Sequence, residues 1–162
     1  MRIYWIDNLE SGNLGLMPRP KGNDWLYDEL HKLKLCGVDI LVSLLENSEL
    51  DELDLQEEST ICEELSIKFI SFPIQDRSVP MSRQAFITLI QQLNNELDKG
   101  NKIVIHCRMG IGRTGMLAAG ILMQRGYDVN SAFELLTNVR TISVPDTEEQ
   151  VEWVQNTLYN DR

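Results

Sequence analysis

Residues 103–114 have the sequence Ile-Val-Ile-His-Cys-Arg-Met-Gly-Ile-Gly-Arg-Thr, and the rest of the chain is organised around them. The apolar start predicts a buried strand, the two glycines predict a loop, and the residues from Arg113 onward predict the start of a helix. Cys107 ends the strand and Arg113 begins the helix, with five residues between them. This spacing places a sulfur atom and a guanidinium group at the two ends of one short loop.

Such a loop is suited to hold a phosphate dianion against the sulfur of Cys107. Successive backbone N–H groups of residues 108–113 can point inward and form an anion site. The following helix adds unpaired N–H groups and the positive end of its dipole. Arg113 adds two parallel donors that match phosphate oxygens. Gly110 and Gly112 allow the positive φ values and the close backbone approach that this loop requires. A thiol that faces such a field is expected to react as thiolate.

The loop also carries a family resemblance. His106-Cys107, Gly110 and Arg113-Thr114 resemble the motif H-C-x-x-G-x-x-R-[ST] of cysteine-dependent protein tyrosine and dual-specificity phosphatases. A bare Cys-x5-Arg spacing also occurs in rhodanese-like and arsenate-reductase-like proteins, but the flanking residues favour the phosphatases. The alternative is an ordinary strand-turn-helix with a buried cysteine, which would leave Arg113 and both glycines unexplained.

The resemblance implies a role for each residue of the loop. Cys107 would attack phosphorus and form a cysteinyl phosphate, and Thr114 would hydrogen-bond the sulfur when it leaves. His106 would brace the loop through its imidazole. The phosphoryl oxygens would be bound by the Arg113 guanidinium and by backbone N–H groups, namely those of Arg108, Met109, Gly110, Ile111, Gly112 and Arg113.

Another residue must protonate the leaving oxygen, and Asp76 is the candidate. It follows a predicted strand over residues 67–72 and lies on a loop between Pro73 and Pro80. The loop sequence Pro-Ile-Gln-Asp-Arg-Ser-Val-Pro resembles the Pro-Ile-x-Asp-x-x-x-Pro form of many family members. In the second step the same carboxylate would accept a proton from water. A turn aspartate without a catalytic role is the alternative.

Gln150 has two interpretations that the sequence leaves open. Some members of the family position the hydrolytic water with a glutamine in this region. Thr147-x-x-Gln150 also fits a capping box at the start of the last helix.

Short strands alternate with amphipathic helices along the chain. This predicts an α/β fold with a central, mostly parallel sheet of four or five strands, flanked by helices on both faces. Ligands of such sheets bind at the carboxyl ends of the strands, where Cys107 lies. Predicted N-caps are Asn23 or Asp24, Ser82 and Asp128. We expect strands at 3–6, 14–16, 39–45, 67–72 and 103–107, and helices at 23–37, in pieces over 46–64, and at 82–100, 113–126, 128–139 and 147–158.

The composition bounds the possible functions. The chain has 162 residues, of which 43% are hydrophobic and 25% charged, and one domain over residues 1–162 is expected. Asp and Glu number 25 against 15 Lys and Arg, so the formal net charge is −10. This charge argues against general binding to nucleic acid or to an anionic membrane, since both need a basic surface. No cluster of metal-ligand residues stands out, and we expect neither a metal nor a cofactor.

The three cysteines, Cys36, Cys62 and Cys107, are too few for a disulfide framework. A thiolate nucleophile needs a reducing compartment, so we expect a cytoplasmic protein without a signal peptide or a membrane-spanning segment. Spacing does not decide whether Cys36 or Cys62 would pair with an oxidised Cys107. The sequence also does not determine the oligomeric state.

The resemblance covers most of the chain and is nearest to the compact atypical dual-specificity group, particularly kinase-associated phosphatases. It implies hydrolysis of phosphorylated proteins or peptides, with phosphotyrosine preferred over phosphoserine and phosphothreonine. Met109 and Ile111 are apolar and are expected to line an entrance suited to an aromatic ring. A phosphoinositide phosphatase is the alternative, because Arg108 and Arg77 could each receive a second anionic group, although the loop lacks the lysines of the lipid-directed branch. A catalytically silent phosphopeptide-binding module is less favoured, because the expected nucleophile, acid and arginine are all present.

Overall fold

A five-stranded sheet forms the centre of the protein in a computed structural model that describes residues 1–7 and 9–159. The strand order is β1-β2-β5-β3-β4. β1 pairs antiparallel with β2, and the other pairings are parallel. The strands are β1 (Tyr4–Trp5), β2 (Asn13–Met17), β3 (Ile40–Ser43), β4 (Lys68–Ser71) and β5 (Lys102–His106). The predicted mostly parallel sheet is therefore confirmed, with its single antiparallel strand at one edge.

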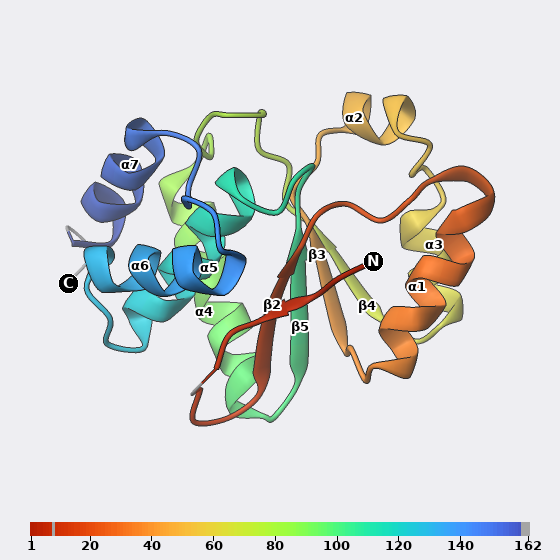
Figure 1. Ribbon diagram of the computed structural model, residues 1–162, viewed down its shortest axis with the longest axis horizontal. Coiled ribbons are helices and arrows are strands. Elements are labelled where there is room, and N and C mark those ends of the chain that lie inside the picture. The colour runs from red at the N-terminus through yellow and green to blue at the C-terminus, as the bar shows by residue number, and fades with distance from the viewer. Residues whose placement is uncertain (8, 160–162) are drawn as a thin grey trace.

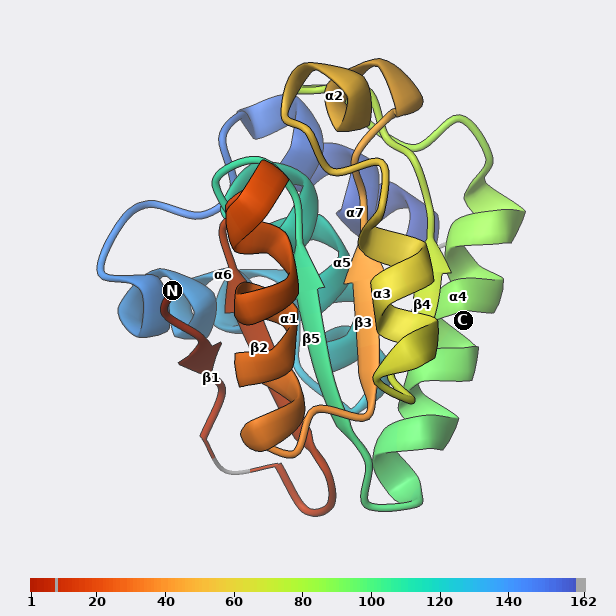
Figure 2. The same cartoon turned by 90° about the vertical axis from the view of Figure 1, so that its right-hand side faces the viewer.

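Helices cover both faces of this sheet. Figures 1 and 2 show α1 and α3 on one face and α4, α5, α6 and α7 on the other. The described helices are η1 (Asn23–Trp25), α1 (Leu26–Leu35), α2 (Asn47–Glu52), α3 (Glu58–Glu64), α4 (Arg83–Asp98), α5 (Gly112–Gln124), α6 (Val129–Arg140) and α7 (Glu148–Tyr159). Among them no helix has the length and apolar character that crossing a bilayer requires.

The strand β5 contributes to two separate cores, because alternate side chains of a strand point to opposite faces. Ile103 and Ile105 pack into the cluster under α4 and α5, whereas Val104 packs into the cluster under α1 and α3. All three are fully buried. Burial on both faces explains why this strand is apolar throughout.

Side-chain caps start two helices as predicted. The Ser82 hydroxyl accepts from the N–H of Ala85 at 3.1 Å, and the Asp128 carboxylate accepts from the N–H of Ser131 at 2.8 Å. The predicted cap of α1 is wrong, because a 3₁₀ turn precedes that helix and neither element has a side-chain cap. The Asn23 amide instead donates to the Asp54 carboxylate at 3.1 Å.

The parallel strands end level with one another. Met17 and Ser43 are both register partners of His106, and Ser43 is also the partner of Ser71. The segments that follow these strands therefore emerge on the same side of the sheet, at the carboxyl ends of the strands. At the top of Figure 1 these segments include the loop after β5, the loop after β4 and α2. The fold thus brings Cys107 and Asp76 to the same end of the molecule.

Candidate active site

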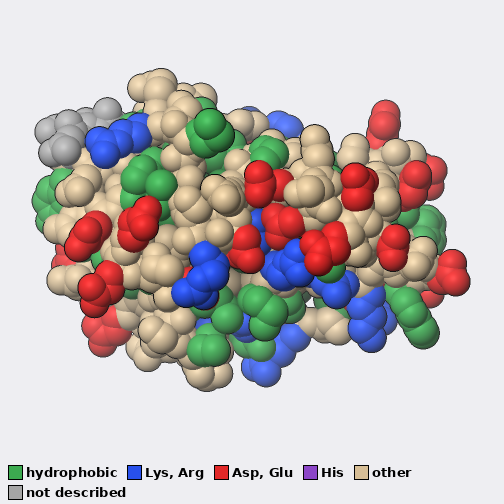
Figure 3. Space-filling model, turned by 90° about the horizontal axis from the view of Figure 1, so that it is seen from above, with side chains coloured by type: hydrophobic (Ala, Val, Ile, Leu, Met, Phe, Trp, Pro, Cys, Tyr) green, Lys and Arg blue, Asp and Glu red, His purple; other side chains and the backbone are tan. Residues whose placement is uncertain are grey.

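A cavity of about 120 Å³ opens at this end of the sheet. It contains the predicted nucleophile, acid and arginine. Its lining residues are Asp76, Arg77, Cys107, Arg108, Met109, Gly112, Arg113 and Asp146. Figure 3 looks onto this end of the molecule, where basic side chains gather in the middle and acidic side chains lie on both sides. Basic side chains are therefore concentrated, together with carboxylates, at this end of an acidic protein.

The phosphate loop, residues 107–113, turns its carbonyl groups away from the sulfur. The Arg108 carbonyl accepts from the N–H of Arg19 at 3.1 Å, and the carbonyls of Met109 and Gly110 accept from the Arg140 guanidinium at 3.0 and 3.2 Å. In a trans peptide the C=O and the following N–H point in opposite directions. The next N–H groups therefore face the other side of the loop, and that of Gly110 donates to Cys107 Sγ at 3.3 Å. This is the geometry of an anion nest.

Gly110 is required at its position for two reasons. Its φ of +72° lies in the left-handed region, which side chains other than glycine rarely adopt. A Cβ atom here would also come within 2.5 Å of the Met17 carbonyl oxygen at the end of β2. The loop therefore rests directly on the backbone of the neighbouring strand.

Arg113 is oriented by a buried carboxylate that the sequence analysis did not identify. Its Nη1 and Nη2 donate to the two oxygens of Glu49 at 2.6 and 3.0 Å, and Nη1 also donates to the Ile74 carbonyl at 2.9 Å. Asp76 Oδ1 lies 3.2 Å from Nη2. The Arg113 side chain is 1% exposed. Burial by itself would lower the pKa of Arg113, but the bond to Glu49 and the negative charges of Cys107, Glu49 and Asp76 raise it.

Substitution of Glu49 by glutamine is expected to destabilise the protein by about 3 kcal/mol, since it leaves a buried guanidinium without its counter-charge. It should also lower turnover, because Arg113 loses its fixed orientation. Chemical denaturation and steady-state kinetics measure the two effects. Glu52→Gln is the matched control on the same helix, since Glu52 is 62% exposed and pairs with Arg108 at the surface, where ion pairs contribute little.

The cost of Glu49→Gln should depend on pH. Burial would raise the pKa of Glu49, but hydrogen bonds from Arg113 and the Glu46 backbone, with the charge of Arg113, lower it overall. A carboxylate with a depressed pKa stabilises the fold above its unfolded pKa, about 4.3 for glutamate, and this contribution is lost as pH falls through the folded pKa. The stability difference should therefore shrink below about pH 4. A difference that is equal at pH 7 and pH 3 would contradict this ion pair.

His106 connects the loop to a second buried carboxylate. Its Nε2 lies 2.9 Å from Glu58 Oε2, and its Nδ1 lies 3.2 Å from the Cys107 carbonyl oxygen. Both side chains are fully buried. The imidazole is thus held between α3 and the backbone of Cys107, the position expected for a residue that braces the loop.

The two other cysteines are poorly placed to react with Cys107. Burial, with the nearby charge of Glu58, raises the pKa of Cys62 to about 12, so this thiol stays protonated and unreactive. Cys36 is exposed, but its carbonyl accepts from Lys102 at the start of β5. It therefore lies near the amino end of β5, whereas Cys107 follows the carboxyl end of that strand.

Gln150 forms the contacts of one of its two interpretations, and Thr114 follows directly after the phosphate loop. The Thr114 hydroxyl is buried and has no hydrogen-bond partner within the described ranges. Gln150 forms the capping box, accepting from the N–H of Thr147 at 3.3 Å and donating its own N–H to that threonine's hydroxyl at 3.1 Å. Its side-chain amide also donates to the Ser78 carbonyl at 3.0 Å.

The cavity entrance is only partly as expected. Met109 lines the cavity and is 60% exposed. Ile111 is buried in the core under α4 and α5, so the expectation that it lines the entrance is wrong. Arg108 donates to Glu52 at 2.9 Å and to Glu49 at 3.4 Å, and the bond to Glu52 raises its pKa. Its charge is therefore already paired.

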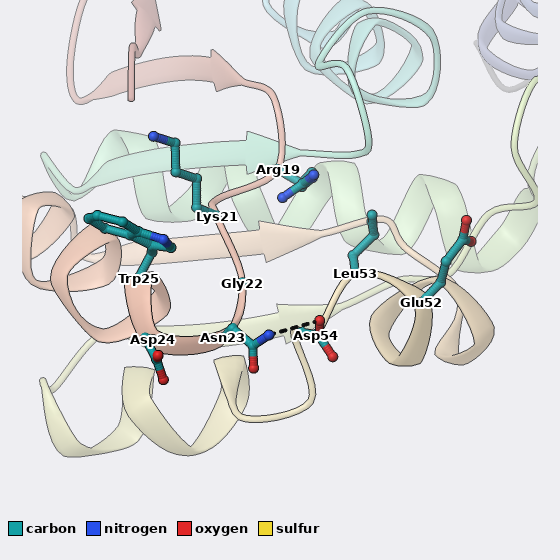
Figure 4. A pocket seen from close by; sticks show the side chains of 9 residues that line it. All are labelled: Arg19, Lys21, Gly22, Asn23, Asp24, Trp25, Glu52, Leu53 and Asp54. Atoms are coloured by element: carbon teal, nitrogen blue, oxygen red, sulfur yellow. Dashed lines mark hydrogen bonds between the residues drawn. The ribbon is translucent and has the colours of Figure 1, made fainter.

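A larger open cavity of about 470 Å³ lies beside the site. Figure 4 shows its lining, with Trp25 and Glu52 on opposite sides and Asn23 bonded to Asp54. Glu52 lines this larger cavity and pairs with Arg108, which lines the smaller one. Among the described residues that line it there is no cysteine, serine or histidine. The cavity that contains Cys107 is therefore the candidate active site, although the neighbouring cavity has the larger volume.

Comparison with known proteins finds similar phosphatases. Residues 15–127 match a family described as "Polymorphic toxin system, DSP-PTPase phosphatase". A protein of Invertebrate iridescent virus 3, 067L, named as a candidate tyrosine phosphatase, is 31% identical over 99 residues, which are 59% of this chain and 38% of the viral protein. The chain spans 22% to 38% of the length of the curated relatives it matches.

Solved structures share the fold. A kinase associated phosphatase with its catalytic-site cysteine changed to serine superposes with a TM-score of 0.90 at 20% identity, covering 99% of this chain and 94% of that one. The active form of Tk-PTP superposes with a TM-score of 0.78 at 24% identity, covering 99% and 97%. At these identities the likeness concerns the fold.

Proposed function

Because this chain belongs to the DSP-PTPase phosphatase family described from polymorphic toxin systems, we propose that it hydrolyses phosphotyrosine in proteins or peptides through a cysteinyl phosphate. One observation carries the proposal. Cys107, Arg113 and Asp76 line a single cavity, and the phosphate loop presents its N–H side to the sulfur. Nucleophile, anion site and proton donor, the three groups that phosphomonoester hydrolysis requires, are thus within one small site.

In the first step the phosphoryl oxygens bind to the loop N–H groups and to Arg113. Arg113 keeps its bidentate bond to Glu49 on one side and exchanges Asp76 for phosphate on the other. Cys107 Sγ attacks phosphorus, and the bond from phosphorus to the leaving oxygen breaks. Asp76 is 53% exposed and forms an ion pair with Arg113 at 3.2 Å before substrate arrives. Once phosphate has displaced it from Arg113, the Asp76 carboxyl group, carrying a proton, protonates that oxygen. Water later hydrolyses the S–P bond and regenerates the thiolate.

Asp76→Asn is expected to slow hydrolysis of tyrosyl phosphate by about a hundredfold, within the range of general acid catalysis. Hydrolysis of p-nitrophenyl phosphate, whose leaving group is a much weaker base, should slow far less. The measurement is kcat/KM for both substrates at several pH values. Asp51→Asn, an exposed aspartate of α2 outside the cavity lining, is the control. Equal losses on the two substrates would mean that Asp76 only shapes its loop.

The substrate class rests on the charges around the cavity. Arg108 is paired with Glu52 and Glu49, so a second anionic group would have to compete with these carboxylates, and the loop contains no lysine. The net charge of −10 also disfavours approach of a polyanionic lipid headgroup. The exposed Met109 offers an apolar surface for an aromatic ring. These features support phosphotyrosine as the preferred substrate.

The test compares kcat/KM for a phosphotyrosine peptide, matched phosphoserine and phosphothreonine peptides, and a short-chain phosphoinositide. We expect the order phosphotyrosine, then phosphoserine and phosphothreonine, then phosphoinositide. Arg77→Ala should leave the peptide rate within a few-fold of wild type. A clear preference for the phosphoinositide that is lost in Arg77→Ala would reverse the substrate class.

A further inference from the structure

We propose that Asp146 is a second carboxylate of the active site and that it accepts a proton from the water that hydrolyses the cysteinyl phosphate. The inference rests on the proposed function, because it assigns a role in the second step of that reaction. The family resemblance implies instead that Asp76 serves in both steps.

Asp146 lies on the wall of the same cavity as Cys107 and Asp76. Its carboxylate sits directly over Gly112, the first residue of α5. A Cβ atom added to that glycine would come within 2.8 Å of Asp146 Cγ and would collide with Oδ2. Gly112 therefore leaves the space that the carboxylate fills. The two carboxylates reach the cavity from different segments, Asp76 from the loop after β4 and Asp146 from the loop before α7.

The loop that carries Asp146 is fixed to the helix below it. Val144 is buried and packs against Gly115 of α5, and its N–H donates to the Thr137 hydroxyl at 3.1 Å. The N–H of Asp146 donates to Gln150 Oε1 at 3.0 Å. The backbone on both sides of the carboxylate is thus held, so the side chain is kept at the cavity.

Gln150 itself is not suited to bind the hydrolytic water. It is fully buried. Its amide oxygen accepts from the N–H groups of Asp146 and Thr147, and its amide nitrogen donates to the Ser78 carbonyl. The oxygen and the nitrogen of the Gln150 amide are therefore both hydrogen-bonded to backbone groups. Gln150 instead connects the loop of Asp76 with the loop of Asp146, which makes it a positioning residue for both.

The Asp146 carboxylate is available for proton transfer. Within residues 1–7 and 9–159 it forms no side-chain hydrogen bond or ion pair, whereas Asp76 is bonded to Arg113. Asp146 is also exposed, so a proton that it accepts can pass to solvent. In the second step the water oxygen bonds to phosphorus, the S–P bond breaks with its electron pair going to Cys107 Sγ, and the water proton goes to Asp146.

Separate measurement of the two steps tests the proposal. In rapid mixing with p-nitrophenyl phosphate, Asp146→Asn should release the first equivalent of p-nitrophenol as fast as wild type. The following steady rate should fall on the order of a hundredfold, the size of a general-base contribution, and quenched enzyme should contain accumulated cysteinyl phosphate. Asp146→Glu should restore the steady rate in part. Glu148→Gln, an exposed carboxylate two residues away that does not line the cavity, should behave as wild type.

Three outcomes would overturn the proposal. If Asp146→Asn forms cysteinyl phosphate but turns over at the wild-type rate, Asp146 is not the base, and the proposed function stands. If burst and steady rate fall together, Asp146 only shapes the cavity. If wild-type enzyme itself forms no cysteinyl phosphate while it hydrolyses substrate, the proposed function fails, and this inference fails with it.

Discussion

Replacement of Cys107 by serine is expected to abolish turnover while binding of vanadate or phosphate is retained. A serine hydroxyl does not ionise near neutral pH, so the attacking group is lost. The anion site does not depend on the sulfur, because the loop carbonyls remain bonded to Arg19 and Arg140. Steady-state kinetics with a phosphotyrosine peptide and calorimetric titration with vanadate measure the two properties.

Cys36→Ser is the matched control, because Cys36 is exposed and lies near the amino end of β5. It should have wild-type activity. Serine differs from cysteine by one atom and has a similar volume, so it can occupy the same buried position, which is 3% exposed. The thermal unfolding midpoint should therefore change little. Turnover of Cys107→Ser within a few-fold of wild type would exclude Cys107 as the nucleophile.

Arg113→Lys is expected to lower kcat on the order of a thousandfold, the scale at which a transition-state arginine contributes to phosphoryl transfer. A guanidinium can hold Glu49 through two donors and present its remaining edge to phosphate, whereas an ammonium is a point charge that cannot do both. The variant should also be destabilised, since the Glu49 carboxylate loses one of its two bonds from residue 113. Denaturation and single-turnover kinetics at a temperature where the variant is folded separate the two effects.

Arg108→Lys is the control for Arg113→Lys. Arg108 lies in the same loop, but its guanidinium is about one-third exposed and is directed to Glu52 and Glu49. We expect a change in kcat of no more than a few-fold. A similar loss in both variants would mean that positive charge in the loop matters and that the bidentate geometry of Arg113 does not.

Each strand of the sheet and the phosphate loop were predictable because the residues that define each of them are close in sequence. The apolar run before Cys107, the two glycines and Arg113 lie within twelve residues, and the chemistry of a turn and of a helix start depends on such local patterns. The same holds for Ser82 and Asp128, whose caps are formed within three residues.

The partners of the loop could not be predicted, because they come from distant segments. Glu49 and Glu58 lie in an acidic stretch with seven further carboxylates, of which Glu52 also pairs with the loop, through Arg108 at the surface. Arg140 ends a helix that follows the site. No periodicity distinguishes a buried carboxylate from an exposed one. What distinguishes Glu49, Glu58 and Arg140 is their burial in the folded structure.

Asn23 and Gln150 show how tertiary contacts override a local pattern. Asn23 has the residue type of a cap, but its amide bonds to Asp54 across the neighbouring cavity wall. Gln150 does form its capping box, yet the same side chain also reaches Ser78. A local motif therefore does not exclude a second, long-range contact for the same side chain.

The most direct test of the cysteinyl-phosphate mechanism is to locate the phosphoryl group on the enzyme. Wild-type protein is mixed with an excess of phosphotyrosine peptide, quenched within milliseconds, digested and analysed by mass spectrometry, with Cys107→Ser as the blank. We predict a phosphoryl group on Cys107 that forms and decays at rates consistent with kcat and is missing in Cys107→Ser. Turnover without any phosphorylated cysteine, or phosphorylation of another side chain that persists in Cys107→Ser, would contradict the account.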